Sequence, residues 1–202
     1  PDHKPGVPNS GWVKGPGNTV LKDPSQWQRL EDYVKDIVGS YAKDDRIVIW
    51  DIYNEPWNCF LIDLNQPPIM RSLSMLGNLI KHQFGFGPTK RLLYQAFSWA
   101  REMNPQQPLT AGAYYLTPFL PARLNQDCLA LSDIASFHSY FNLKETEKIV
   151  SGLEEQNRPL ICTEYMGRSA GSTFESIMPL YKEHKKSKYR QKPNKKTAGL
   201  GM

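Results

Sequence analysis

The chain has 202 residues, of which 40% are hydrophobic, 11% aromatic and 22% charged, a composition typical of a soluble globular protein rather than a disordered one. No run of eighteen apolar residues occurs, so no membrane partner is expected. The net charge of +5 comes from residues 182–196, which hold seven Lys, one Arg and one Glu. The remainder is slightly acidic, so we expect a solvated basic end and no nucleic-acid partner.

Along the chain, helical and strand patterns alternate. Residues 1–22 are predicted to be a loop, and Asp23, followed by Pro24 and Gln26, predicts the start of a helix with apolar positions from Trp27 to Tyr41. Strands are predicted at 47–53, 109–115, 134–140 and 159–165, and further helices at 89–103, 121–131, 145–156 and 172–184. This alternation predicts an α/β fold with a parallel sheet, either open or closed into a barrel.

Two segments do not fit the alternation. The first gap between strands is about 30 residues longer than the others, and the surplus lies in residues 58–88. This stretch is either a long loop over an active site or sequence foreign to the fold. We therefore expect one domain over residues 1–184, with an insertion at 58–88, and a basic, disordered tail over residues 185–202.

Polar residues end three of the four strands. Asn54 and Glu55 end the first, His138 and Tyr140 the third, and Glu164 and Tyr165 the fourth. The carboxyl ends of parallel strands meet at one rim, where α/β active sites are built. Any one of these residues, considered alone, would be interpreted as a structural or loop residue. Together they predict a site at this rim.

Two facing carboxylates suit glycosidic bond cleavage. One protonates the leaving oxygen while the other attacks the anomeric carbon. Asn54 can bind a sugar 2-hydroxyl, Tyr140 or Tyr165 can orient the nucleophile, and His138 can support the acid or line the sugar site. Trp12 and Trp57, in or beside loops at this rim, are expected to stack on sugar rings.

The motifs "IWDIYNEP" (49–56), "SFHSYF" (136–141) and "PLICTEYMGR" (159–168), with "GWVKGPG" (11–17), resemble the clan A glycoside hydrolases, most closely the cellulase-like group around family 5. The resemblance covers roughly residues 9–57 and 89–184. It implies a partial (β/α)8 TIM barrel containing about strands four to seven with their helices. It also implies a retaining mechanism with Glu55 as acid/base and Glu164 as nucleophile.

By the same resemblance, Asn54, His138 and Tyr140 are sugar-site residues, the partner is a carbohydrate, and no metal or organic cofactor is needed. Where the family has strands one to three and strand eight, this chain has no matching segment, so we expect a fragment of a barrel. At the place of strand eight, the abrupt change to a basic segment suggests a frameshifted or prematurely ended reading frame. The alternative function is a non-catalytic carbohydrate-binding remnant. A third possibility is an unrelated open α/β protein with other acid/base chemistry.

Several properties stay open at this stage. The three cysteines, Cys59, Cys128 and Cys162, follow no metal-binding spacing and do not indicate a redox compartment. Residues 1–12 lack the apolar core of a signal peptide, and a chain that begins within a coding sequence would lack one in any case. The cellular location, an extracellular or periplasmic one included, the oligomeric state and the identity of the glycan are therefore not predicted.

Overall fold

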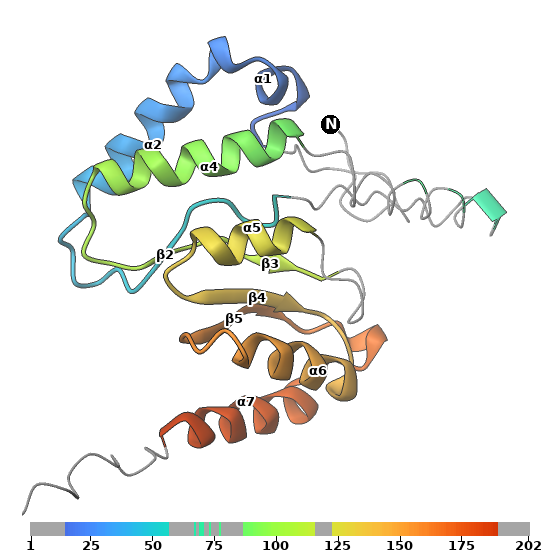
Figure 1. Cartoon of the computed structure of the whole chain (residues 1–202). Helices are drawn as coiled ribbons and strands as arrows, with labels where there is room; N and C mark the ends of the chain where they lie inside the picture. The colour runs from blue at the N-terminus through green and yellow to red at the C-terminus, as the bar shows by residue number, and fades with distance from the viewer. Residues whose placement is uncertain are drawn as a thin grey trace, which may run out of the picture.

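The computed structural model describes residues 15–56, 87–115 and 123–189, with a few single positions between 67 and 77. In chain order the elements are α1 (Asn18–Lys22), η1 (Pro24–Gln26), α2 (Gln28–Ser40), β1 (Trp50–Asp51), α4 (Gly87–Glu102), β2 (Leu109–Thr110), β3 (Ala113–Tyr114), α5 (Arg123–Leu131), β4 (Ala135–Ser139), α6 (Leu143–Glu154), β5 (Leu160–Tyr165), η2 (Arg168–Ala170) and α7 (Phe174–Tyr189). In Figure 1, α2 and α4 lie toward the β2 end of the row of strands, and α6 and α7 lie toward the β5 end. The predicted α/β class is confirmed.

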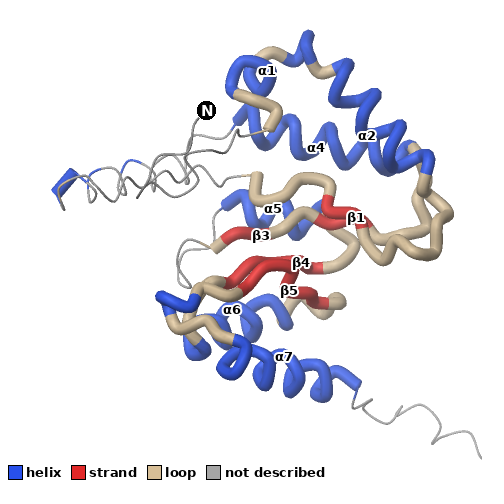
Figure 2. Tube along the Cα trace, turned by 180° about the vertical axis from the view of Figure 1, so that it is seen from behind, coloured by secondary structure: helices blue, strands red, loops and turns tan. Residues whose placement is uncertain are grey.

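All strand pairs are parallel and follow the chain order. β1 pairs with β2, with Asp51 opposite Thr110, and a second sheet has the order β3-β4-β5. The single strand predicted at 109–115 is interrupted at residues 111–112, where its neighbour changes from β1 to β4. The chain from β2 to β3 therefore links the two sheets, which lie side by side in Figure 2.

The helices pack against one face of these strands. Leu109 and Ala111 belong to an apolar cluster with Leu93 and Phe97 of α4. Residue 113, two positions further, belongs to a cluster with Phe137 of β4 and with residues of α6 and α7. Because alternate residues of a strand share a face, α4, α5, α6 and α7 all cover the side that carries residues 109, 111 and 113.

The opposite face of the strands is polar. Thr110 Oγ1 and Ser136 Oγ are 2.8 Å apart and buried, and Thr110 also donates to the carbonyl of Ile134 at 3.1 Å. These bonds satisfy hydroxyl groups that would otherwise be costly to bury. His138, two residues beyond Ser136 on β4, continues this polar face.

The amino-terminal helix differs from its prediction. Asp23 does accept from the backbone N–H of Ser25 at 3.1 Å, but it caps the short helix η1. The side chain of Gln26 also bonds Asp23, at 2.7 Å, so this turn closes on itself and α2 begins only at Gln28. The predicted loop 1–22 likewise contains helix α1 within its described part.

Other boundaries shift for local reasons. α6 begins two residues before its predicted start, because Asn142 accepts from the N–H of Glu145 and caps the helix there. The predicted strand 47–53 is reduced to Trp50–Asp51 as a paired strand. α7 continues to Tyr189, into the segment expected to be a disordered tail. Most of the 58–88 insertion and the end of the tail lie outside the described residues.

None of the helices in the described part of the chain is long and apolar enough to cross a membrane.

Candidate active site

The two glutamates at the strand ends lie close together, as expected for residues at the carboxyl ends of parallel strands. Glu55 follows β1 and Glu164 lies in β5, yet a carboxylate oxygen of each and a ring nitrogen of His138 all lie within 4.8 Å of one another. The three residues come from the carboxyl ends of three different strands. A carboxyl separation above about 10 Å would have favoured an unrelated α/β protein with other acid/base chemistry, and the two glutamates lie much closer than that.

His138 lies between the two carboxylates. Its Nδ1 shares a hydrogen bond of 2.5 Å with Glu55 Oε1, and its Nε2 lies 3.6 Å from Glu164 Oε1. The His138 side chain is fully buried, and within the described residues Nε2 has no hydrogen-bond partner. A buried ring nitrogen without a partner is costly, so its direction toward Glu164 marks a position prepared for a polar group.

Glu164 is surrounded by hydrogen-bond donors. Tyr140 donates its phenolic O–H to Glu164 Oε2, and Asn54 Nδ2 donates to Glu164 Oε1 at 3.4 Å. Burial raises the pKa of Tyr140 well above its ordinary value, and the hydrogen bond to Glu164 and the charges of Glu164 and Glu55 raise it further. Tyr140 therefore stays protonated at neutral pH and remains a donor to the carboxylate.

A β-bulge turns Glu164 toward the site. Phe137 lies opposite Cys162, but the next residue, His138, lies opposite Glu164, so Thr163 is an extra residue in β5. If Thr163 were regularly paired with His138, Glu164 would be paired with Ser139, on the face covered by the helices. Bulges of this kind are frequent beside active sites because they re-aim one side chain.

The backbone at Glu55 is also unusual. Its φ of 42° lies in the left-handed region, which costs a non-glycine residue on the order of 1–3 kcal/mol. The side chain of Glu55 is only 10% exposed, against 40% for Glu164. The strained turn after β1 thus directs Glu55 inward to His138.

Gly112 provides the space in which His138 lies. A Cβ atom at this position would be 2.8 Å from His138 Nε2 and 3.1 Å from Asn54 Oδ1. Cβ atoms essentially never approach another atom as closely as the first of these distances, so a side chain at position 112 would force the His138 ring to move. Sequence reasoning treated residues 109–115 as one strand and missed this role, although a glycine inside a strand pattern indicates a close approach.

Tyr165 does not belong to the site, which corrects its prediction as a substrate-binding residue. Its ring packs edge-on against Phe174 and Tyr181 of α7, and its hydroxyl donates to Met178 Sδ at 3.4 Å. Because of the bulge, Tyr165 is paired with Ser139 and faces the helices. Trp12 and Trp57 lie outside the described residues.

The same three residues could hold a cation. In the described part of the chain, Glu55, His138 and Glu164 form a group that could ligate a metal ion. An imidazole with two carboxylates suits Zn²⁺ or a similar divalent ion. The hydrogen bond between His138 and Glu55 would have to open if Nδ1 were the ligand.

Comparisons with protein-family models, with curated proteins and with solved structures find no match for this chain.

Proposed function

We propose that this chain is a retaining glycoside hydrolase acting on β-linked glycosidic bonds, with Glu55 as acid/base and Glu164 as nucleophile. The observation that carries the proposal is the pair of carboxylates with oxygens within 4.8 Å of each other. Retaining enzymes hold their carboxyl groups about 5–5.5 Å apart, whereas inverting enzymes need about 6.5–9.5 Å to admit a water molecule.

The surroundings of each glutamate support these roles. Tyr140 and Asn54 donate hydrogen bonds to Glu164 and fix the orientation of its carboxyl group, as a nucleophile requires. In this proposal Asn54 also donates to a sugar 2-hydroxyl beside Glu164. Glu55 faces His138, a group able to share a proton with it, which suits proton transfer to and from the leaving oxygen.

The proposed reaction has two steps. Glu164 attacks the anomeric carbon, the bond to the leaving oxygen breaks, and Glu55 transfers its proton to that oxygen. Glu55 then takes a proton from water as the water oxygen attacks the same carbon. The ester to Glu164 breaks, and both carboxyl groups return to their starting states.

We further propose that the fold is part of a (β/α)8 barrel. The strands are parallel and neighbours in chain order, and the described helices α4–α7 cover one face of them. In an open doubly wound sheet, helices cover both faces and the strand order reverses. One-sided cover with a polar opposite face is the pattern of a barrel, whose site lies at the carboxyl ends of its strands.

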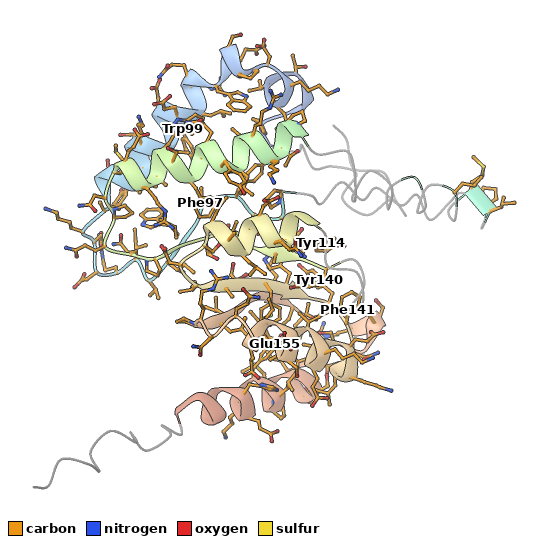
Figure 3. All side chains as sticks on the ribbon, viewed as in Figure 1. Phe97, Trp99, Tyr114, Tyr140, Phe141 and Glu155 are labelled. Atoms are coloured by element: carbon orange, nitrogen blue, oxygen red, sulfur yellow. The ribbon has the colours of Figure 1, made fainter. Side chains whose placement is uncertain are left out.

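The test is turnover of 4-nitrophenyl β-D-glycosides with gluco, manno, xylo and galacto configuration. We expect hydrolysis of at least one, lowered at least a thousandfold by Glu164→Ala. Azide should then restore turnover with distinct products: an α-glycosyl azide from Glu164→Ala and a β-glycosyl azide from Glu55→Ala. Glu155→Gln, at the exposed end of α6, is the matched control and should leave activity unchanged (Figure 3).

A fluorinated sugar provides a second readout. A 2,4-dinitrophenyl 2-deoxy-2-fluoro-β-glycoside of the accepted configuration should attach covalently to Glu164, as peptide mass analysis would show. Labelling of Glu55 instead would reverse the two roles. Absence of hydrolysis and of labelling with every configuration would exclude the proposed activity.

A further inference from the structure

The chain between β2 and β3 presents alternate residues to the site. Thr110 bonds Ser136 on the polar face, and Gly112 lies against the ring of His138. Tyr114 is the next residue in this alternating series and lies directly opposite His138 across the β3–β4 ladder. Because paired residues of parallel strands share a face, Tyr114 lies on the same face as the two glutamates.

A buried amide fixes the backbone of Tyr114. Asn125 of α5 accepts from the N–H of Tyr114 at 3.2 Å and donates to its carbonyl at 2.7 Å. Asn125 is 1% exposed. A buried amide is costly without partners, so these two bonds both satisfy Asn125 and hold one particular residue at the end of β3.

Tyr114 is a neighbour of Tyr140. Figure 3 shows the two tyrosines at the same end of adjacent strands. Tyr114 is half-buried and Tyr140 is 37% exposed, so both reach solvent at this rim. Tyr114 also contributes to the raised pKa of Tyr140, as expected of two phenols that lie close together. A partly exposed aromatic ring on a fixed backbone, on the face of the strands that carries the two carboxylates, has the form of a binding surface.

We propose that Tyr114 is a substrate contact whose ring packs against a pyranose ring held between Glu55 and Glu164. The inference rests on the proposed function, because it takes a carbohydrate as the ligand. Sugar rings present apolar C–H faces to aromatic side chains, and a tyrosine also has a polar end for the sugar hydroxyls. Tyr114 binds ground state and transition state alike, so its loss weakens binding rather than the chemical step.

The kinetic test uses the 4-nitrophenyl glycoside that the protein accepts. Tyr114→Ala should raise KM about tenfold, the equivalent of about 1.4 kcal/mol, and keep kcat within about threefold. Tyr114→Phe keeps the ring and should change KM less than about threefold. The control is Tyr94→Ala, which removes an exposed tyrosine of α4 bonded to Asp127 and should change neither constant.

The binding test does not require turnover. In Glu164→Gln, saturation-transfer NMR would measure contact with cellotriose, mannotriose and xylotriose, each β-linked. Transfer from protein to sugar should fall about tenfold with Tyr114→Ala added and persist with Tyr94→Ala. Tyr114→Leu removes the aromatic face but keeps an apolar side chain of substantial size, so it should bind as weakly as Tyr114→Ala. If alanine disturbs folding, the leucine variant still tests the contact.

The outcomes separate the two proposals. Sugar binding that depends on Tyr114 without any hydrolysis supports this contact and overturns the hydrolase. Hydrolysis with an unchanged KM in both Tyr114→Ala and Tyr114→Leu overturns the contact and leaves the hydrolase. A protein that neither binds nor hydrolyses any of these sugars overturns both.

Discussion

Single residues set the geometry of this site in ways that their chemical type does not reveal. Gly112 has no side chain, and its missing Cβ makes room for the buried ring of His138, which lies between the two glutamates. Glu55 reaches that ring from a left-handed backbone conformation. The chemistry of the rim therefore depends on the space at position 112 and on the backbone conformation at position 55 as much as on the two carboxylates.

Substitution of Gly112 tests this dependence. We predict that Gly112→Ala lowers the free energy of unfolding by about 1–3 kcal/mol, the usual cost of overpacking, and lowers glycoside turnover at least tenfold. The imidazole NMR signals of His138 should shift as the ring is displaced. These signals report the displacement whether or not the protein is a hydrolase.

The matched control is Gly152→Ala. Gly152 lies on α6 with no atom within 4 Å of a Cβ at that position. Alanine there should raise the free energy of unfolding by up to about 1 kcal/mol through helix propensity, without moving the His138 signals. Unchanged His138 signals in Gly112→Ala would contradict the role given to this glycine.

The raised pKa of Tyr140 predicts a pH dependence. A group with a higher pKa in the folded state contributes stability that is fully present below its unfolded pKa, near 10.0, and is lost as pH rises through the folded value. The difference in unfolding free energy between the protein and Tyr140→Phe should be constant below about pH 9 and shrink in alkali. Urea unfolding across pH 7–11 measures this difference in unfolding free energy. A difference that grows in alkali would contradict the prediction.

At the scale of elements, the bulge in β5 leaves Thr163 unpaired and Glu164 opposite His138. Deletion of Thr163 should restore regular pairing, with Cys162 opposite Phe137 and Glu164 opposite His138 as consecutive pairs, so Glu164 stays on the face of the site. We predict that the deletion variant keeps measurable turnover and that adding Glu164→Ala to it abolishes that turnover. Glycoside turnover assays measure both.

The substitution Thr163→Ala is the control, because it keeps the number of residues in β5 and changes only the side chain. Thr163 is exposed, so alanine should leave both activity and stability nearly unchanged. Loss of turnover in the deletion variant but not in Thr163→Ala would contradict the expectation that regular pairing keeps Glu164 opposite His138.

At the scale of the molecule, the site joins distant parts of the chain. Asn54 and Glu164 are 110 positions apart in sequence, and His138 and Tyr140 come from a third strand between them. A ligand bound to all of them would hold the β1 end of the strands to the β5 end. Binding should therefore stabilise the whole fold rather than one loop.

This gives a prediction that needs no catalysis. A β-linked trisaccharide at 100 times its Kd should stabilise Glu164→Gln by about 2.7 kcal/mol, seen as a higher Tm in calorimetry. Maltotriose, which has the same glucose units as cellotriose but α-linkages, is the matched control and should give a much smaller shift. Equal shifts with both sugars would indicate nonspecific stabilisation.

The sequence alone predicted the parts of this molecule that depend on local pattern. The α/β class and the meeting of Glu55, His138, Tyr140 and Glu164 follow from apolar periodicity and from the rule that parallel strands end at one rim. Tyr165 was assigned wrongly because simple alternation and adjacency cannot reveal a bulge. The roles of Gly112 and Asn125 arise from contacts with other strands and helices, which no local pattern specifies.

The extra residue in β5 has a consequence for how such a site changes in evolution. Because Thr163 is unpaired, the strand can carry one residue or none between Cys162 and Glu164 and still place the carboxylate opposite His138. A lineage could therefore gain or lose this residue without turning the glutamate away from its partner. A search for related sites should accept both spacings between the inward-facing cysteine position and the glutamate.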